Sequence, residues 1–499
     1  MTTLTSLDAS PSPPAGSGGA GGSAAVAARW WKSPRLVLAI AIAAWVVMFG
    51  IVMVRHHRNF GTFAFDLGIF DQSIWLMGEG EGFNTVRGLH TWGHHASVGY
   101  YLFVPFYWLG AGPLFLDLSQ LVILAAGAIP VFLLGRDLLK NEWVALVPAL
   151  AFLIHPTNQW FLREGFHPEV VAITPLLWAV LAARRRRWVA YAIWMTVAVS
   201  FKEDIALAAA MFGVVLVVRG HRRIGAVTIV AALGWLAFVS TVLIPAYSPA
   251  GDFYGQFYGD FGDTPTEVAW SVVSRPGDTI DRLTDAGFFG YLRKLGGPLG
   301  LLALLSPLTL LIGAPQVMIN LLTVQSFTWS TWYHYAALPL AACTVATVEG
   351  LARIRRRALL IAMVIGLAVV SVTTAVVMGV SPASGYYREG YWALAPREAQ
   401  ELMEQAVTYP GSDDTVAATY NLLPRLTHRR HIYLFPNPWM TLDWGVSGEN
   451  PHDPTTVQWL VLDRSKLDPG ENELLDEILE DGWTIHLDEA GIVAAEHSG

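Results

Sequence analysis

The sequence predicts a mainly α-helical protein that crosses a membrane many times and ends in a small α/β domain. Of its 499 residues, 53% are hydrophobic and 14% are charged, whereas soluble proteins contain about 25% charged residues. The mean hydropathy of +0.42 supports the same interpretation. This composition excludes a large soluble enzyme, a disordered chain and a nucleic-acid-binding protein with a broad basic surface.

Charge divides the chain into two parts. Residues 381–499 hold 7 Lys and Arg against 20 Asp and Glu, whereas the preceding 380 residues hold 25 against 20. Most cations of the first part lie in short clusters between apolar runs, so we expect the two parts to occupy two compartments. The single cysteine, Cys343, excludes an intrachain disulfide and a cysteine-based metal site.

The N-terminus leads into the first span. Residues 1–35 are expected to be disordered and cytoplasmic, because residues 1–28 are mainly Ser, Pro, Gly and Ala. The apolar run Leu36–Val54 has 19 residues, enough to cross a bilayer core of about 30 Å at about 1.5 Å per residue. Cations in front of it hold that end in the cytoplasm, so the run leads outward.

Further cation clusters mark the cytoplasmic loops. They are Arg136/Lys140, Arg184–Arg187, Arg219/Arg222/Arg223 and Arg353/Arg355–Arg357. Two helical hairpins fit between them and turn outside, at 163–169 and at 202–204. The first outer loop, 55–97, must be followed by one crossing, Leu114–Gly135, if Arg136 is to lie inside. Val98–Leu109 then becomes a short aromatic helix at the outer interface.

The remaining apolar runs complete the membrane domain, residues 36–380. They are Ile224–Ile244, Pro298–Gly313, Ala314–Val324, Tyr335–Gly350 and Ala358–Val380, with an outer loop at 246–297. The count is about eleven crossings. An odd count leaves residues 381–499 outside the plasma membrane.

The tail, residues 381–499, has the pattern of a small α/β domain. Helical spacing covers Pro396–Thr408 and Glu471–Glu480. Short β-branched and aromatic runs predict strands. They are Thr415–Ala418, His431–Phe435, Val457–Leu462, Trp483–Leu487 and Gly491–Ala495, the last two forming a hairpin.

The first outer loop contains two carboxylates, Asp66 and Asp71, in the aromatic stretch 63–75. One interpretation makes Asp66 a helix cap and Asp71 part of a solvated face. The functional interpretation is that a carboxylate at the lipid–water boundary meets a lipid-linked substrate and acts as a base. The residues alone leave both open.

Histidines follow in the same loop, at His90, His94 and His95. Adjacent His94 and His95 cannot both face one side of a regular element, and no zinc spacing is present. Hydrogen bonds to a substrate phosphate or to Asp66 are therefore favoured over metal ligation.

The later outer turns are also rich in ionisable residues. The second turn holds Glu164, His167 and Glu169, and the third holds Lys202, Glu203 and Asp204. Capped turns and a snorkelling lysine would explain some of them. Ionisable groups beside spans are nevertheless costly and often mark function.

A last outer segment, 329–335, is rich in Trp and Tyr. An aromatic belt explains these residues but not His334, a donor able to hold a lipid phosphate. The chain has no Walker loop, no dinucleotide-binding glycine turn and no His-Glu-x-x-His motif.

The order of these features resembles the GT-C superfamily of integral-membrane glycosyltransferases, which includes protein O-mannosyltransferases, oligosaccharyltransferases and aminoarabinose transferases. Its members share an outward first span, a long first outer loop with an essential acid, interfacial helices and a second acidic outer turn. The matching positions are Asp66 and Glu164 to Glu169, while Tyr333 to Pro339 is similar to the segment that meets the lipid phosphate. Several members have adjacent Asp and Glu in the first loop, so the choice between Asp66 and Asp71 stays open.

More closely, the chain resembles a bacterial family of predicted polytopic membrane proteins of unknown function. This resemblance covers nearly everything after residue 35. It is carried by Phe-Asp-Leu-Gly-Ile-Phe-Asp-Gln at 65–72, Phe-His-Pro-Glu at 166–169, Phe-Lys-Glu-Asp at 201–204, and Asn421-Leu-Leu-Pro424, His428-Arg429-Arg430 and Tyr433-Leu-Phe-Pro436.

The GT-C resemblance implies transfer of a sugar from a polyprenyl-phosphate donor to an extracytoplasmic glycan, lipid or protein, with the outer tail presenting or selecting the acceptor. It makes Asp66, Asp71 and Glu164 the candidate catalytic residues. The candidate substrate-binding residues are His94, His95, His167, Glu169, Lys202, Glu203, Asp204, His334 and Tyr335. A divalent cation, Mg²⁺ or Mn²⁺, could take part, and Glu164 and His167 are the candidates to bind this ion, the sugar or the phosphate.

Two alternatives remain at this level. One is a secondary transporter or flippase, and the other is a catalytically silent membrane scaffold with an extracellular binding domain. Transporters often show internal repeats and helices broken at mid-span. Here the ionisable residues gather at one face, which favours the transferase. Its expected partners are the lipid bilayer, the lipid-linked donor and an acceptor, and no nucleic acid.

Overall fold

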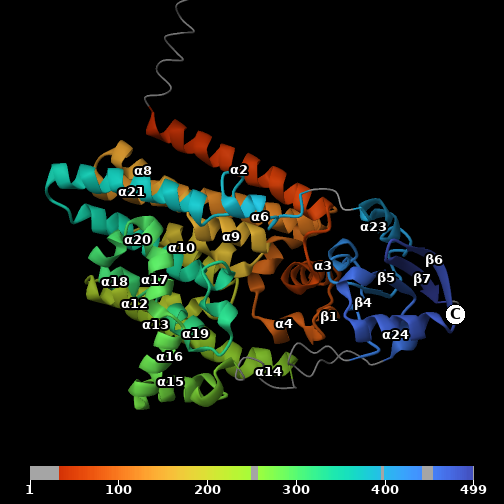
Figure 1. The fold of residues 1–499 in the computed structure, drawn as a ribbon. Coiled ribbons are helices and arrows are strands. Elements are labelled where there is room, and N and C mark those ends of the chain that lie inside the picture. Colours follow the sequence, from red (N-terminus) through yellow and green to blue (C-terminus); the bar gives the residue numbers. More distant parts are fainter. Residues whose placement is uncertain (1–32, 249–256, 395–397, 441–452, 498–499) are drawn as a thin grey trace, which may run out of the picture.

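The computed structural model describes residues 33–248, 257–394, 398–440 and 453–497. They form a helical body with a small α/β domain against one end (Figure 1). The expected disorder of residues 1–35 lies almost wholly outside the described residues. We call the end of the body beside the α/β domain the domain end.

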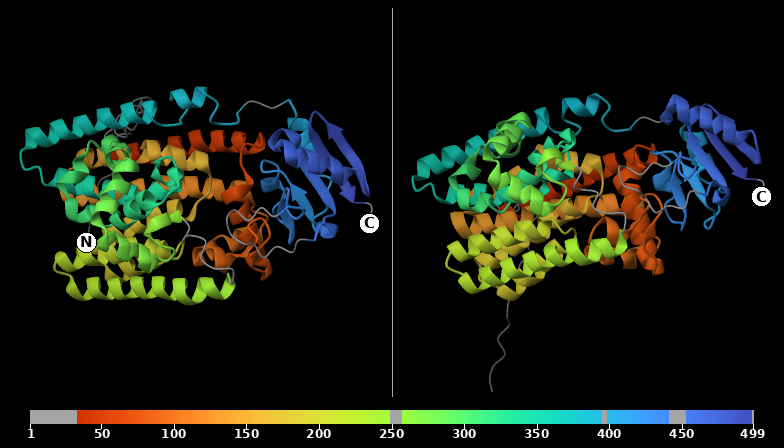
Figure 2. Two further views of the ribbon diagram at one scale, coloured as in Figure 1. Left: turned by 60° about the horizontal axis from the view of Figure 1, so that its bottom comes forward. Right: turned by 90° about the horizontal axis from the view of Figure 1, so that it is seen from below.

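Helices make up most of the body. In chain order they are α2 (Pro34–Arg58), α3 (Ile69–Glu79), α4 (Thr91–His94), α5 (Val104–Tyr107), α6 (Pro113–Ala126), α7 (Ala128–Leu139), α8 (Glu142–Leu153), α9 (Pro156–Glu164), α10 (Pro168–Arg184), α11 (Trp188–Val199), α12 (Ile205–Val218), α13 (Arg222–Phe238), α14 (Ile244–Tyr247), α15 (Pro265–Ser274), α16 (Pro276–Asp285), α17 (Phe288–Gly296), α18 (Pro307–Leu310), α19 (Ala314–Leu322), α20 (Ala337–Ala352), α21 (Arg357–Val377) and α22 (Gly385–Arg388). The strands β1 (Phe83–Asn84) and β2 (Leu89–His90) form a small hairpin beside α3. Figure 2 shows the longer helices lying roughly side by side across the body.

Five helical stretches among the described residues are long and apolar enough to cross a membrane. They are Pro34–Arg58, Pro113–Leu139, Arg222–Tyr247, His334–Ala352 and Arg357–Val377. Several of them carry exposed aliphatic side chains, such as Val47, Val230 and Val369. A lipid environment explains such a surface, because alkyl chains solvate it without the cost that water imposes.

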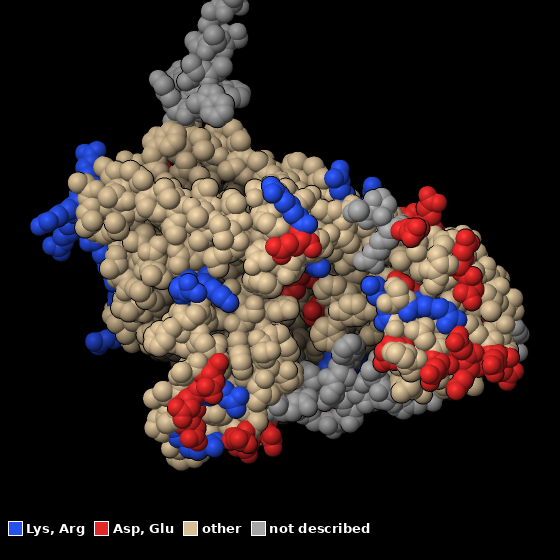
Figure 3. Space-filling model, in the orientation of Figure 1, with Lys and Arg blue, Asp and Glu red and all other residues tan. Residues whose placement is uncertain are grey.

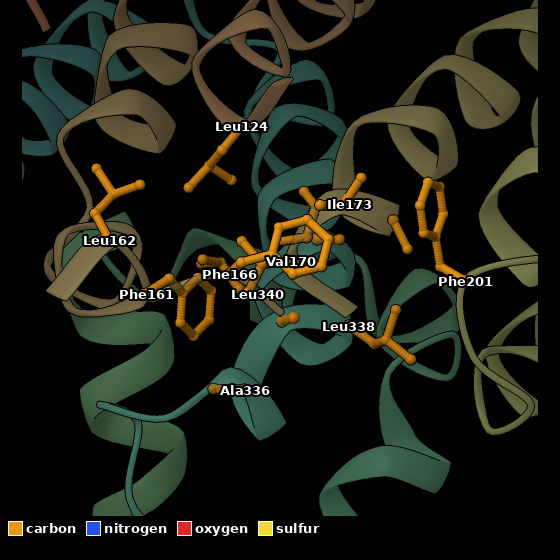
Figure 4. Packing of buried hydrophobic residues seen from close by; sticks show 14 of the residues in the cluster. Leu124, Phe161, Leu162, Phe166, Val170, Ile173, Phe201, Ala336, Leu338 and Leu340 are labelled. Atoms are coloured by element: carbon orange, nitrogen blue, oxygen red, sulfur yellow. The ribbon is translucent and has the colours of Figure 1, made fainter. Parts of the chain in front are cut away.

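The centre of the body is closely packed. Side chains from α6, α9, α10 and α20 meet around Phe166, with Leu124, Phe161, Val170 and Leu340 among them (Figure 4). These residues pack against the turn between α9 and α10. Close packing restricts the positions that the turn's polar side chains can adopt.

Arginines gather at the end of the body opposite the α/β domain (Figure 3). We call this end the arginine end. There Arg219 donates to Glu349 at 2.7 Å, and Ser306 donates to the same carboxylate at 2.8 Å. The cation clusters of the sequence thus share one end of the molecule, as the predicted topology requires.

The segment between α14 and α20 departs most from the expectation. Residues 246–297, expected to be a loop, contain α15, α16 and α17. The two crossings expected over Pro298–Val324 consist of short helical turns with α18 and α19, because Gly and Pro interrupt them repeatedly. Eleven regular spans are therefore not confirmed.

The region before α6 also differs in detail. Val98–Leu109, expected to be one helix, is a 3-10 turn at Val98–Leu102 followed by the short helix α5. Pro105 stands at the start of α5 and has no backbone N–H, so it cannot donate a hydrogen bond that would continue the preceding turn. Pro113–Leu139 is one continuous apolar stretch, consistent with a single crossing at Leu114–Gly135.

The C-terminal domain is a five-stranded sheet with helices. Its strands are β3 (Val416–Ala418), β4 (Ile432–Leu434), β5 (Trp459–Asp463), β6 (Trp483–Glu489) and β7 (Ile492–His497), with α23 (Gln400–Ala406) and α24 (Pro469–Leu479). The strand order is β4-β3-β5-β7-β6, with β3 parallel to β4 and β5, and β7 antiparallel to β5 and β6. All five strands lie where the sequence predicts them. The helix expected at Pro396–Thr408 begins at Gln400, and residues 395–397 lie outside the described residues.

Candidate functional site

Asp66 occupies an irregular turn just before α3. Its backbone has φ 65° and ψ −82°, a region near the positive-φ γ-turn that is rare and strained for residues other than glycine. The turn is held from the C-terminal domain, because the Ala64 N–H donates to the carbonyl of Tyr420 at 2.8 Å. The ring of Phe63 also stacks on Tyr420, with centroids 5.2 Å apart.

The turn between α9 and α10 is braced by α6. Gly165 has φ 100° and ψ −165°, a conformation almost restricted to glycine. The amide nitrogen of Gln120 donates to the Gly165 carbonyl at 2.7 Å, and Gln120 Oε1 accepts from the His167 N–H. Asp117 Oδ1 accepts from the Phe166 N–H at 2.9 Å. These bonds direct Glu164 and His167 to the domain end.

The first loop and this turn meet at His167. Its Nε2 lies 3.2 Å from Asp66 Oδ2 and 3.8 Å from Glu164 Oε1. The ring of His334 stacks on that of His167, with centroids 3.9 Å apart and planes 17° apart. His334 reaches Glu164 twice, through Nδ1 at 2.9 Å and its backbone N–H at 2.7 Å. Glu164 thus joins both imidazoles.

Lys202 extends the network toward the third turn. Its Nζ pairs with Glu169 and lies 3.8 Å from Asp204 Oδ2. Glu169 Oε1 lies 3.8 Å from His334 Nε2. We call Asp66, Glu164, His167, Glu169, Lys202 and His334 the carboxylate–imidazole cluster. The structure therefore brings together residues from three predicted turns and the segment before α20.

Other predicted residues border this cluster. Glu203 Oε1 pairs with His95 Nδ1 at 2.8 Å, and its Oε2 accepts from the Ala96 N–H. The ring of His94 lies 4.3 Å from that of His95. The ring of Tyr335 lies 4.0 Å from that of His334. These residues form the border of the cluster.

The charges of Asp66 and His167 support each other. Burial lowers the pKa of His167, but the charges of Glu164 and Asp66 outweigh burial and raise that pKa to about 10. Burial likewise opposes ionisation of Asp66, yet the charge and hydrogen bond of His167 hold the pKa of Asp66 below its usual value. At neutral pH the two groups therefore form an ion pair.

Asp71 lies elsewhere. Its carboxylate is fully buried and accepts from the hydroxyls of Tyr107 and Thr427, each at 2.5 Å. His428 Nε2 lies 3.1 Å from Oδ2, the oxygen that also accepts from Thr427. The geometry thus separates the two acids of the first loop: Asp66 meets the second turn, and Asp71 meets the C-terminal domain. The catalytic role expected of Asp71 stays a prediction.

A hollow separates the helical body from the C-terminal domain, and acidic side chains lie deep inside it (Figure 3). A small cavity of about 10 Å³ adjoins Glu164, with Thr62, Phe63, Arg163 and Gly165 in its wall. That volume suits about one water molecule. A single water molecule would therefore fit beside Glu164.

Three members of the cluster could hold a cation. Glu164, His167 and His334 offer ligand atoms that lie within 4.8 Å of one another. Two imidazoles and a carboxylate suit Zn²⁺ better than Mg²⁺ or Mn²⁺, which prefer oxygen ligands. Binding would require the Glu164–His334 hydrogen bond to open. The expected Mg²⁺ or Mn²⁺ thus stays a prediction.

The sequence analysis assigned no role in the site to five supporting residues. Asp117 and Gln120 brace the second turn, while Tyr107, Thr427 and His428 hold Asp71. A signal existed for the first pair, because two polar residues three positions apart in an apolar span must share a buried face. For the other three, no spacing linked them to Asp71.

Comparison with known proteins identifies the family to which the chain belongs. Residues 56–494 match the family described as predicted membrane protein (DUF2079). The chain belongs to this family. The predicted resemblance to a membrane-protein family of unknown function is thereby confirmed. A search of curated proteins finds no match.

One solved structure has a fold similar to that of this chain. The crystal structure of ArnT from Cupriavidus metallidurans in the apo state matches with a TM-score of 0.54 and 14% sequence identity. The match covers 94% of this chain and 98% of ArnT. At this identity the likeness concerns the fold alone. This DUF2079 protein therefore has an ArnT-like fold.

Proposed function

We propose that this DUF2079 protein is a membrane glycosyltransferase that moves a sugar from a polyprenyl-phosphate donor to an extracytoplasmic acceptor. ArnT is a GT-C glycosyltransferase, and the shared fold supports the same class of activity. One observation carries the proposal: Asp66 lies 3.2 Å from His167 at the centre of a cluster of acids and imidazoles. Such a cluster, beside a membrane, is suited to reaction at a lipid headgroup.

The proposed orientation follows from charge. The arginine end would face the cytoplasm, as positively charged loops do. The domain end, with the cluster and the C-terminal domain, would then face the extracytoplasmic side of the plasma membrane. The donor's polyprenyl tail would lie in the bilayer against the exposed aliphatic helices. Its phosphate would reach the cluster at the membrane surface.

In the proposed reaction, the bond between the sugar's anomeric carbon and the donor phosphate breaks, and polyprenyl phosphate leaves with the electron pair. A new bond forms between the anomeric carbon and the acceptor oxygen. The acceptor's hydroxyl proton passes to the Asp66 carboxylate. Because His167 lowers the pKa of Asp66, this base is weak, and it would orient the hydroxyl first and take its proton late.

The phosphate would be stabilised by the imidazoles. His167 is positively charged at neutral pH because its pKa is raised to about 10. His334 stacks on it and offers a second ring. Lys202 is already paired with Glu169, so its main role would be to hold that acid. Fixing donor and acceptor against Asp66 would contribute several kcal/mol through proximity, within the about 7–11 kcal/mol that oriented reactions reach.

Complementation of a deletion strain tests the proposal. Envelope glycans and glycolipids are profiled in the deletion strain carrying the wild-type gene, Asp66→Asn or Glu79→Gln. Glu79 is an exposed acid at the end of α3 and serves as the matched control. A sugar-bearing species should vanish on deletion, return with wild type and Glu79→Gln, and stay absent with Asp66→Asn.

Protein levels in the membrane are measured alongside. A general base typically contributes about 10²–10⁴-fold to a rate, so the Asn variant should make a trace of product at most. Full restoration by Asp66→Asn would refute the role of Asp66. A glycan profile unchanged by the deletion would refute the transferase itself.

A further inference from the structure

The C-terminal domain meets the first loop through the segment that follows β3. This segment, Tyr420–His428, is called the clamp segment here. It begins after the carboxyl end of β3 and leads back toward the amino end of β4, because these two neighbouring strands are parallel. Its two ends contact different parts of the helical body, Tyr420 at the turn that contains Asp66 and Thr427 at Asp71.

One side of the clamp holds the start of that turn. The Ala64 N–H donates to the Tyr420 carbonyl at 2.8 Å. Leu423 fills the space beside Gly68, where an added Cβ would lie 2.9 Å from its side chain. The backbone of residues 64–68 therefore has little freedom to move away from the domain.

The other side of the clamp holds α3 through Asp71. This carboxylate is fully buried and accepts from Thr427 at 2.5 Å, with His428 Nε2 at 3.1 Å. Tyr107 donates to it from the body at 2.5 Å. The next residue, Gln72, donates to the carbonyl of Arg429 at 3.2 Å. Asp71 is thus an anchor between three parts of the chain.

Asp66 lies between these two anchors in a strained conformation. Strained backbone persists only where surrounding contacts impose it. The anchors at Ala64 and Asp71 flank the turn on both sides, and both depend on the clamp segment. We propose that the clamp segment is a positioning element of the site, which holds the Asp66 turn against His167 through Ala64 and Asp71.

Thr427→Val and Thr427→Ser provide the test in the full-length protein in lipid nanodiscs. Val removes the hydroxyl that donates to Asp71, whereas Ser keeps it. Hydrogen exchange over residues 60–72 reports on the clamp without any substrate. Exchange of the Ala64 amide should rise roughly tenfold with Val and stay within about twofold of wild type with Ser. Thr373→Val, at an exposed position of α21, is the matched control.

Kinetics supply the second readout and rest on the proposed function. With a donor that the wild type uses, Thr427→Val should lower kcat by roughly tenfold or more and leave KM for the lipid donor unchanged, because a small misplacement of a reacting group slows chemistry. Ser should restore kcat. A merely structural role would lower the amount of folded protein and leave kcat per folded molecule unchanged.

The outcomes separate the two proposals. A glycan profile unchanged by the deletion would refute the transferase, while the exchange experiment would still decide the clamp. Unchanged Ala64 exchange in Thr427→Val would overturn the clamp, whatever the activity. Should Thr427→Val fail to fold, Asp71→Asn gives the same decision, because it weakens the contact with His428 while keeping the size of the side chain. Unchanged exchange in that variant also overturns the proposal.

Discussion

His167 Nε2 lies 3.2 Å from Asp66 Oδ2, although the two residues belong to different turns far apart in the sequence. The contact joins an imidazole whose pKa is raised and a carboxylate whose pKa is lowered. The charges of Glu164 and Asp66 overcome the effect of burial on the pKa of His167, and the charge of His167 overcomes the effect of burial on the pKa of Asp66. The pair therefore determines the protonation state in which the proposed site would work.

Replacing His167 with Gln should move the acid limb of kcat/KM to higher pH. In the wild type, His167 lowers the pKa of Asp66, so the carboxylate stays ionised well into acidic solution. Without that charge, burial raises the pKa of Asp66, and protonation begins at higher pH. The check is a pH–rate profile of both proteins.

His486→Gln is the control for this profile. His486 pairs only with Glu496 in the C-terminal domain among its described contacts of opposite charge, so its loss should leave the acid limb in place. If the acid limb of kcat/KM in His167→Gln lies at the same pH as in the wild type or at lower pH, ionisation of Asp66 does not determine that limb.

Gly165→Ala should destabilise the turn between α9 and α10 by about 1–3 kcal/mol. The residue has φ 100°, and an added Cβ would lie 3.3 Å from Asp117 Oδ1, which holds the Phe166 N–H. Thermal unfolding in detergent measures the loss, and product formation per folded molecule should fall as Glu164 and His167 shift.

Gly277→Ala is the matched glycine replacement. Gly277 lies exposed in α16 with open space around its Cβ position, and alanine favours helix by up to about 1 kcal/mol. The midpoint temperature of thermal unfolding of Gly277→Ala should therefore stay the same or rise. An unchanged midpoint in Gly165→Ala would mean that the turn relaxes without strain.

The elements that the sequence predicted well are those whose signal is local. Leu36–Val54 lies within α2 because a long apolar run between cations needs only lipid to be helical. The strands of the C-terminal domain follow from β-branched runs bounded by turn residues. The sequence also predicted that the acidic turns lie together, because successive loops between membrane crossings alternate between the two sides of the membrane and these turns fall on the same side.

What could not be predicted depends on contacts between distant segments. The choice between Asp66 and Asp71 rested on whether Thr427 and His428 would reach the first loop, and no spacing encodes that. The broken segment before α20 lacks the regular period on which helix prediction relies. Its short turns are held by tertiary bonds, such as Ser371 to the Pro298 carbonyl at 2.7 Å.

Removing the charge of Lys202 and removing the charge of Glu169 should lower the stability of the protein by different amounts. Both side chains are buried, and removing one partner of a buried ion pair costs about 3–5 kcal/mol. Lys202→Met leaves both Glu169 and Asp204 without their cation, whereas Glu169→Gln leaves Lys202 with Asp204 at 3.8 Å. The lysine variant should therefore lose more stability than the glutamate variant.

A double-mutant cycle measures the coupling. The combined Glu169→Gln and Lys202→Met protein should lose less than the sum of the single losses, because residues in contact are not additive. Arg430→Met, which breaks an exposed contact with Glu81, should change stability by less than about 1 kcal/mol. Additive losses would mean that the lysine and glutamate act independently, and that Glu169 is held in the cluster by His334 instead.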